Sequence, residues 1–427
     1  MSLLSSKLSA TAAFALLLGM APAFATELEF YFPVAVGGPA AETVQQLTDA
    51  YVALHPDMKI TAVYTGSYRD TSTKALTAAR GGNSPQLAVL LANDLFTLID
   101  EDVVEPFDDH VSEADKTEWF GAFYPAFMAN GQTGGMTYGI PFQRSTPVLF
   151  WNKAAFKEAG LDPEKAPENW AEMVEFGQKL TTKDASGNVV RWGVRIPSAG
   201  FPIWLFQALT ASNGLNVGSE DGKSTKFDDP KSIEALQYLV DLSAKHGVMQ
   251  PGAIDWGATP QAFLEGNAAM IWTTTGNYAN IRDTATFDFG VGMLPANTQR
   301  GVPTGGGNFY LFKDSTDEEK AAAVDFVKWM TEPEQAAQWS IATGYIAPRA
   351  DAWETTAMKD YVAKYPDALV ARDQLEHAIG EIATYENAKV NEIINSALEA
   401  AVSGTISPVD ALTDAQTKAD AILSTYR

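Results

Sequence analysis

The alternation of strand and helix patterns near the start of the chain constrains its fold most strongly. Residues 28–33, 59–64 and 87–91 are short apolar runs typical of strands, and residues 42–54 and 72–79 repeat apolar side chains at helical spacing. A β-α-β-α-β order predicts parallel strands with helices on both faces of the sheet. Ligands of such sheets bind at the carboxyl ends of the strands.

The same alternation continues beyond residue 130 and predicts a second unit of the same class. The predicted strands are residues 136–142, 147–151, 269–275, 287–293 and 309–312. The predicted helices are residues 168–180, 233–246, 260–265, 317–331 and 334–343, and a tail from Lys389 that breaks at Gly404 and restarts at Ser407-Pro408. We therefore predict an α/β protein with two domains.

The amino terminus reads as an export signal. Lys7 is its one charged residue, residues 12–20 are apolar, and Ala23-Phe24-Ala25 predicts cleavage after Ala25. No later stretch has the roughly 20 apolar residues of a membrane span. The chain has no cysteine, which excludes a lipid-anchored cysteine and a disulfide. We expect a soluble protein of the periplasm, with residues 1–25 removed.

Charge and residue usage argue against several function classes. The formal net charge of −23 disfavours nucleic acid and anionic membranes as partners. The four histidines lack metal-ligand spacing, and the sequence has no nucleophile-elbow or P-loop motif. Adjacent acids such as Asp108-Asp109 are common by chance among 53 acidic residues. We expect no cofactor, no bound metal and no enzymatic activity, and a monomer.

A stretch near one third of the chain carries a family resemblance. Residues 145–153, STPVLFWNK, form an apolar strand that runs into a short helix ending at Gly160-Leu161-Asp162-Pro163. This stretch resembles the inter-domain crossover of bacterial extracellular solute-binding proteins, which are the capture subunits of ABC importers. Similar pieces follow in the family's order: residues 265–270, 276–282, 289–295, 305–307 and 342–348.

The resemblance implies a two-lobed periplasmic binding protein fold. Each lobe would be a mainly parallel sheet flanked by helices, and hinge strands would join the two. We place lobe one at residues 26–144 and 288–345, and lobe two at residues 145–287 and 346–427. The ligand would bind between the lobes, and the closed form would dock on permease subunits in the inner membrane.

Within the family, residues 145–163 and 279–295 are similar to sn-glycerol 3-phosphate-binding proteins. The resemblance carries ligand-contacting residues over to Tyr68, Ser145, Thr274, Gly306 and Tyr345, and places Trp204 near the aromatic residues of lobe two. Two positions depart. Ala92 stands where that group has a glutamate, with Asn93 and Asp94 next, and Asn391 stands where it has an arginine.

These departures leave the ligand open. One candidate is a glycerol phosphate, a glycerophosphodiester or another anionic carbohydrate, held by Arg144 as a substitute cation and by backbone N–H groups of the glycine run at 305–307. The other is a neutral sugar or polyol, with Tyr68, Tyr345 and Trp204 against its C–H faces. Its hydroxyls would meet the polar side chains of Ser145, Thr274, Asp94 and Asn391. A secreted carbohydrate-active enzyme is the alternative from a different class.

Overall fold

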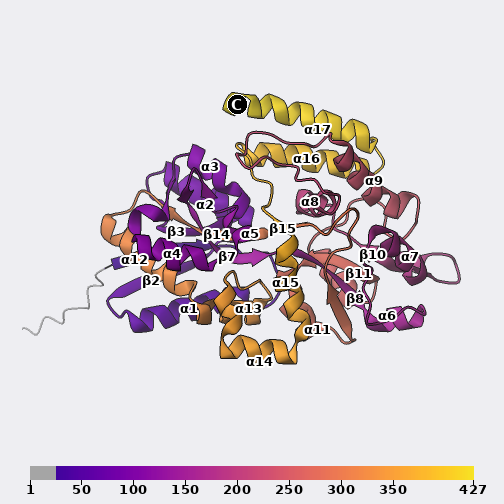
Figure 1. The fold of residues 1–427 in the computed structure, drawn as a ribbon, viewed down its shortest axis with the longest axis horizontal. Helices are drawn as coiled ribbons and strands as arrows, with labels where there is room; N and C mark the ends of the chain where they lie inside the picture. Colours follow the sequence, from indigo (N-terminus) through magenta and orange to yellow (C-terminus); the bar gives the residue numbers. More distant parts are fainter. Residues whose placement is uncertain (1–25) are drawn as a thin grey trace, which may run out of the picture.

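The computed structural model describes residues 26–427, which form two α/β halves side by side (Figure 1). The predicted signal peptide, residues 1–25, lies outside the described residues. Each half is built on one sheet, and the chain passes between the halves several times. The predicted two-lobed α/β architecture is confirmed, and we call the half containing the amino-terminal strand lobe one.

Lobe one is built on a six-stranded sheet in the order β2-β1-β3-β14-β4, with β7 paired to β14. Its strands are β1 (Thr26–Phe32), β2 (Met58–Tyr64), β3 (Leu87–Leu91), β4 (Val104–Glu105), β7 (Gly139–Ser145) and β14 (Gly305–Phe312). The flanking helices are α1 (Ala40–Leu54), α2 (Tyr68–Arg80), α3 (Leu95–Asp100), α4 (Glu113–Glu118), α5 (Pro125–Met128), α12 (Asp317–Met330) and α13 (Pro333–Thr343).

Lobe two is built on a five-stranded sheet in the order β12-β8-β11-β10-β9. Its strands are β8 (Pro147–Asn152), β9 (Thr182–Lys183), β10 (Val189–Arg195), β11 (Ala268–Thr274) and β12 (Phe289–Gly292). Its helices are α6 (Lys153–Glu158), α7 (Trp170–Leu180), α8 (Pro202–Ser212), α9 (Pro230–Ala244), α10 (Ala258–Leu264), α11 (Tyr278–Thr284), α16 (Asn387–Val402) and α17 (Pro408–Leu423).

Short elements complete the description. The two-stranded pairs are β5 (Gln132–Thr133) with β6 (Met136–Thr137), and β13 (Val302–Pro303) with β15 (Ala378–Ile379). Helices α14 (Thr356–Lys364) and α15 (Leu369–Asp373) lie where the lobes meet (Figure 1). Besides the core of each lobe, a third apolar cluster contains Phe127 of lobe one and Phe150 of lobe two.

The sheets are mixed, which corrects the prediction of mainly parallel sheets. β1 runs parallel to β2 and β3, and β10 runs parallel to β11. β14 is antiparallel to β3, β4 and β7, and β8 is antiparallel to β11 and β12. Two of the antiparallel strands, β8 and β14, begin just after the chain has crossed from the other lobe. A parallel neighbour would need a crossover helix within the same lobe, and no such helix precedes these strands.

The crossover strands meet at Thr146, which links β7 of lobe one to β8 of lobe two. The other predicted boundary, at residue 288, lies too early. β12 follows it and pairs with β8, so it belongs to the lobe-two sheet, and the lobe-one sheet resumes only with β14. Tertiary pairing decides which sheet a short apolar strand joins. Its local sequence pattern is the same in either sheet, so the sequence does not show the boundary.

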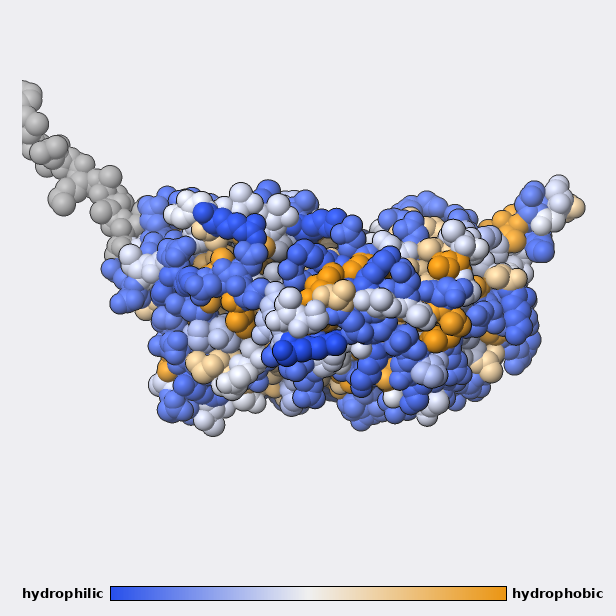
Figure 2. All heavy atoms as spheres, turned by 90° about the horizontal axis from the view of Figure 1, so that it is seen from above, coloured by the Kyte–Doolittle hydropathy of each residue, from blue (hydrophilic) through white to orange (hydrophobic). Residues whose placement is uncertain are grey.

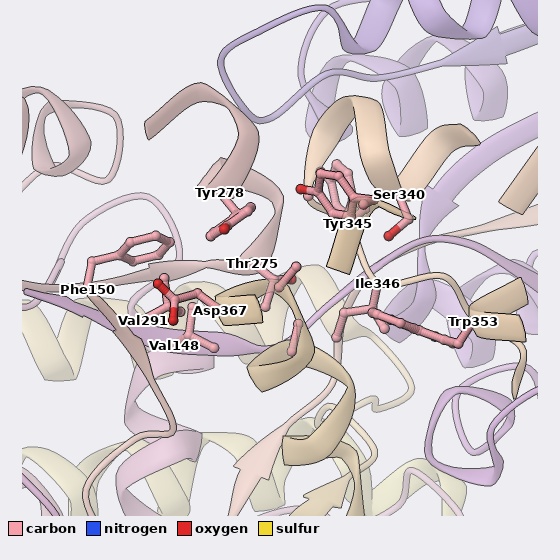
Figure 3. Close-up of a pocket in the computed structure, with 14 residues that line it drawn as sticks. Val148, Phe150, Thr275, Tyr278, Val291, Ser340, Tyr345, Ile346, Trp353 and Asp367 are labelled. Atoms are coloured by element: carbon pink, nitrogen blue, oxygen red, sulfur yellow. The ribbon is translucent and has the colours of Figure 1, made fainter. Parts of the chain in front are cut away.

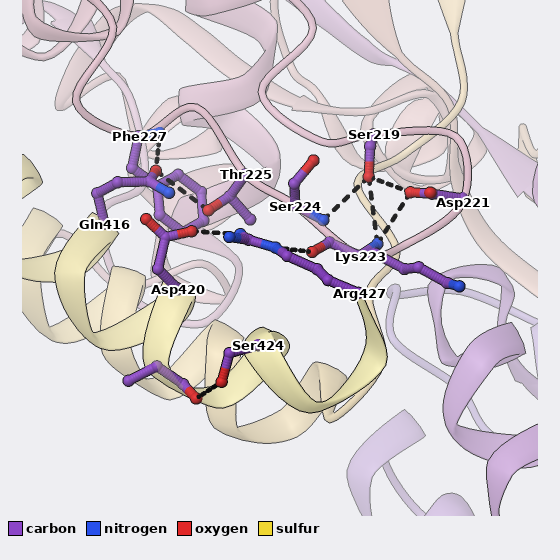
Figure 4. Close-up of polar contacts among 11 residues, drawn as sticks. Ser219, Asp221, Lys223, Ser224, Thr225, Phe227, Gln416, Asp420, Ser424 and Arg427 are labelled. Atoms are coloured by element: carbon purple, nitrogen blue, oxygen red, sulfur yellow. Dashed lines mark hydrogen bonds and ion pairs between the residues drawn. The ribbon is translucent and has the colours of Figure 1, made fainter.

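The last helix, α17, and the carboxyl-terminal residue are fixed to lobe two by specific polar contacts (Figure 4). Gln416 on α17 accepts hydrogen bonds from the Phe227 N–H at 2.6 Å and the Thr225 hydroxyl at 3.1 Å. Arg427 donates to the Lys223 carbonyl at 3.1 Å and pairs with Asp420. The predicted restart at Ser407-Pro408 is present, with Ser407 capping α17 and the proline at its first turn.

Hydrophilic residues cover most of the face shown in Figure 2, and apolar residues gather near the middle of the molecule. The large apolar side chains that are well exposed in the described chain are Leu54, Tyr64, Val190, Ile406 and Val409. Leu54, Tyr64 and Val190 lie on α1, β2 and β10, and Ile406 and Val409 lie just before and at the start of α17. Among residues 26–427, no helix has both the length and the apolar character needed to cross a membrane.

Candidate functional site

A cleft of about 380 Å³ lies between the lobes. Six residues predicted from sequence share its lining: Tyr68, Ser145, Trp204, Thr274, Gly306 and Tyr345. Gly305, from the glycine run predicted to meet the ligand, also lines it. Residues not predicted complete the lining: Ala35, Val36, Leu91, Phe201, Trp256 and Glu381. Both lobes and the crossover therefore contribute to one site.

The lobe-one wall is formed where strands end and helices begin. Tyr68 is the first residue of α2, behind a capping box in which the Asp70 N–H donates to the Ser67 hydroxyl and the Ser67 N–H donates to the Asp70 carboxylate at 2.9 Å. The Tyr68 hydroxyl donates to Gln143 Oε1 at 2.7 Å. Burial raises the Tyr68 pKa well above its usual value, so this side chain stays a neutral hydrogen-bonding group.

The glycine run lies in the same wall but is not a loop. Gly305, Gly306 and Gly307 open strand β14 and pair with β7. Gly306 has a φ of +92°, and a Cβ there would collide with the Gln143 carbonyl. Glycine is therefore needed for close strand packing beside the cleft, and much of the backbone predicted to meet an anion is engaged in the sheet.

The lobe-two wall is aromatic. Trp204 lies on α8, all of whose residues are buried, and its Nε1 donates to the Thr304 carbonyl at 2.8 Å. The ring of Trp256 meets that of Trp204 edge-on at 5.8 Å and that of Phe201 at 5.2 Å. This cluster presents flat apolar faces to the cleft, suited to C–H surfaces or to an organic cation.

The crossover supplies the polar groups between the walls. Ser145 ends β7, and Thr274 ends β11 with its hydroxyl accepting from the Gly276 N–H at 3.1 Å. Tyr345 follows Gly344, whose φ is +90°, and its ring stacks on Trp339 at 5.6 Å. Burial raises the pKa of Tyr345 to about 12, so its hydroxyl is also neutral.

Glu381 is the one carboxylate among the lining residues. Its side chain is 8% exposed, and Asn93 donates to Oε1 at 2.9 Å. The other carboxylate oxygen, Oε2, has no hydrogen-bond partner among the described residues. Burial raises the pKa of Glu381 to about 8, against the opposing effect of the nearby Arg144 charge. A buried acceptor without a partner marks a place where a ligand atom would be stabilised.

Arg144, which was predicted to contact the ligand, is outside the lining. Its side chain is fully buried, and its guanidinium donates to Asn308 Oδ1 and the Thr304 hydroxyl, each at 3.2 Å. It also lies over the Phe127 ring at 5.1 Å. Successive residues of a strand face opposite ways, so Arg144 points into the protein where its neighbour Ser145 faces the cleft. Burial lowers the pKa of Arg144 to about 10.

Asp94 and Asn391 also lie outside the lining. The Asp94 carboxylate accepts from Asn387 Nδ2 at 3.3 Å, and burial raises its pKa to about 6. Asn391 follows one turn after Asn387 on α16, where it is half-buried. Asn93, the neighbour of Asp94, is the residue that touches the site, through its bond to Glu381.

The residues missed by sequence reasoning gave weak signals. Glu381 lies in the nonpolar stretch 378–384, where a charged side chain is unusual without a partner. That contrast is the one local cue to its role. Phe201 and Trp256 lie beside α8, whose sequence is apolar all round, so no amphipathic pattern shows which side chains face a cleft.

Comparison with known proteins agrees with this architecture. Residues 46–367 match the family of bacterial extracellular solute-binding proteins. The chain belongs to this family. The sn-glycerol-3-phosphate-binding periplasmic protein UgpB of Pectobacterium atrosepticum is 28% identical, over 98% of this chain and 96% of its own.

Solved structures of solute-binding proteins share the fold. UgpB from Mycobacterium tuberculosis in complex with glycerophosphocholine superposes with a TM-score of 0.81 and 24% identity, over 94% of this chain and 99% of its own. Maltose-bound MalE3 of T. maritima has a TM-score of 0.79 and 20% identity, over 93% and 100%. This solute-binding protein therefore has the substrate-capturing role of an ABC importer, and its relatives act outside the cytoplasm as binding proteins.

Proposed function

We propose that this protein captures a glycerophosphodiester with a cationic substituent in the periplasm and delivers it to an ABC permease. The chemistry of the cleft carries the proposal. Its lining contains one carboxylate, Glu381, and five aromatic residues, but no lysine or arginine. A bare phosphate monoester would find no cationic side chain there. A zwitterionic diester suits it better, because an organic cation beside Glu381 would lower the raised pKa of that carboxyl and pair with it once it is ionised. The aromatic faces attract the same cation.

Similar proteins support this ligand class. The curated relatives are named for binding sn-glycerol 3-phosphate, and the M. tuberculosis protein was crystallised with glycerophosphocholine. In this chain, Ser145, Thr274 and nearby backbone groups would hydrogen-bond the phosphate and the glycerol hydroxyls. The Arg144 charge, buried behind the site, would act on the phosphate only at a distance.

A neutral sugar is the second candidate. Aromatic faces, hydroxyls and one carboxylate also make a sugar site, and they do so without a cation. Structures of maltose-bound and mannobiose-bound binding proteins share the fold. In this case Glu381 Oε2 would accept a hydrogen bond from a sugar hydroxyl.

The cellular context belongs to the same proposal. Residues 1–25 would be cleaved after Ala25, and the mature protein would act as a monomer without enzymatic activity or a nucleic-acid partner. Because the lining comes from both lobes, a ligand would hold them together and favour a closed form that the permease recognises. Small-angle scattering should show compaction on ligand binding, and its absence would count against hinge closure.

Calorimetric titration with glycerophosphocholine, glycerol 3-phosphate, glycerol and maltose tests the ligand. We expect glycerophosphocholine to bind most tightly, and Glu381→Gln to weaken it by about tenfold or more, since a charge pair is lost. The exposed acid Glu376, in the substitution Glu376→Gln, is the matched control and should change nothing. Binding of maltose alone, with little effect of Glu381→Gln, would favour the sugar instead.

A further inference from the structure

A second cavity, of about 350 Å³, lies behind the crossover strands (Figure 3). Val148 and Phe150 of β8 form one wall, Ser340 and Gly344 at the end of α13 another, and Trp353 contributes a third. Lobe one, lobe two and the segment around α14 and α15 thus all border it.

Tyr345 lines both this cavity and the solute cleft. Thr275, next to the cleft residue Thr274, also lines the cavity; it is 2% exposed, and its hydroxyl has no hydrogen-bond partner among the described residues. The two sites are therefore separate but adjacent, with the crossover between them. A buried hydroxyl without a partner is a place where a ligand would gain a hydrogen bond.

Asp367 brings a carboxylate to this mainly apolar cavity. Figure 3 shows it on one side, near Tyr278 and Val148. Within residues 26–427 no ion pair or hydrogen bond engages that carboxylate, and burial raises its pKa. The neighbouring Lys153, which acts on it electrostatically, is itself paired with Glu164 at 2.5 Å.

Two other cations near the cavity are also paired with acids. Arg282 pairs with Asp283 at 2.7 Å, and Arg372 pairs with Asp373 at 2.6 Å and lies over the Trp353 ring. No lysine or arginine is among the residues that line the cavity. The charge of Asp367 is thus left for a ligand to compensate.

We propose that this hinge cavity binds a small organic cation, an amine on a compact apolar or aromatic body. The ammonium group would pair with Asp367, the apolar body would lie against Val148, Phe150 and Tyr278, and Thr275 would accept a hydrogen bond. The Asp367 carboxylate is half-buried, so a cation beside it is attracted more strongly than by a fully solvated carboxylate, and the aromatic rings add cation–π attraction. Because Tyr345 borders both sites, occupancy of one changes affinity at the other, and the effect is reciprocal.

Benzylamine and its neutral counterpart benzyl alcohol test this site directly, without the transported solute. In calorimetric titrations of the wild-type protein near neutral pH we expect benzylamine to bind about fivefold or more tightly than benzyl alcohol, because the ammonium pairs with a partly buried charge. Asp367→Asn should abolish that preference while leaving benzyl alcohol binding unchanged. Ala371→Phe, at the half-buried edge of the cavity, should weaken both probes by about tenfold.

Binding in the solute cleft must be distinguished, because Glu381 would also attract a cation. A loss of benzylamine binding in Glu381→Gln, with Asp367→Asn unaffected, would place the probe in the cleft and overturn the proposal. No saturable binding up to about 10 mM, a concentration that detects even weak ligands, would overturn it too. Thermal melts check that each variant folds. If Ala371→Phe does not fold, the comparison of Asp367→Asn with wild type, in the preference for benzylamine over benzyl alcohol, is the deciding measurement.

Discussion

The two walls of the solute cleft are built in different ways. The lobe-one wall uses strand ends and a capped helix, with Tyr68 at the first residue of α2 and Gly306 in β14. The lobe-two wall uses aromatic side chains on and beside α8, a helix buried on every side. Local sequence rules place the first wall, whereas long-range packing places the second. We therefore expect a substitution in the lobe-two wall to change solute affinity and the free energy of unfolding together, more than a substitution in the lobe-one wall does.

Trp204→Ala should have the largest effect. The side chain is 6% exposed, donates to the Thr304 carbonyl and packs on Trp256. The cavity left by the ring should cost about 3–5 kcal/mol in the free energy of unfolding. Solute binding should become too weak to measure, because the ring forms part of the wall of the site. Urea unfolding and calorimetry measure the two effects. Trp192→Ala, at a half-buried position on β10, is the control and should leave affinity intact.

The pH dependence of stability sharpens the comparison at the residue between the walls, Glu381. Its pKa is raised from 4.5 to about 8, so the folded state keeps a proton that the unfolded chain releases. Stability should therefore fall as pH rises from about 5 to 8, by at most about 3.5 kcal/mol from this group. Urea unfolding of Glu381→Gln across that range should show a flatter profile than wild type. An equal slope in both proteins would mean that Glu381 is ionised throughout.

Arg144→Met tests whether Arg144 acts on the fold or on the ligand. Removing the guanidinium leaves Asn308 Oδ1 and the Thr304 hydroxyl without a donor and costs about 2 kcal/mol of stability. Solute affinity in the folded protein should change by less than about threefold, since no direct ion pair is lost. Calorimetry below the unfolding temperature measures this. A tenfold or greater loss of solute affinity with unchanged stability would mean that Arg144 contacts the ligand.

Arg144 also illustrates what the sequence could and could not predict. The helix and strand patterns gave most elements, and Ser407-Pro408 gave the start of α17, because caps and periodicity are local. The resemblance brought Tyr68, Ser145 and Tyr345 to one cleft. Strand alternation alone, however, excludes neighbouring residues 144 and 145 from both facing a ligand, and this local rule would have removed Arg144.

What local patterns could not predict depends on contacts far apart in the chain. β12 and β14 lie close together along the chain, and only their pairing assigns them to different lobes. Glu381 meets Asn93 from a position 288 residues away, so neither residue reveals the bond alone. The contribution of α8 is hidden because a helix buried on all sides has no polar face to orient it.

Tyr68→Phe should have the smallest effect. It tests whether the Tyr68 hydroxyl in the lobe-one wall serves folding stability or solute binding. The hydroxyl donates to Gln143 Oε1 at 2.7 Å, and its removal leaves that buried acceptor unpaired. We expect a loss of about 1–2 kcal/mol in the free energy of unfolding. Solute affinity should fall by less than about threefold, since the ring remains in place and its hydroxyl is already bonded to the protein.

Tyr64→Phe, at a tyrosine that is 55% exposed on β2, provides the matched control and should change stability by less than about 0.5 kcal/mol. Urea unfolding and calorimetry of both variants separate the two possible roles of the Tyr68 hydroxyl. Unchanged stability with a large loss of affinity would mean that it donates to the solute when the site is filled. The Tyr68 hydroxyl would then leave Gln143 and bind the solute instead. The lobe-one wall would in that case contribute to solute affinity as much as the aromatic wall opposite it.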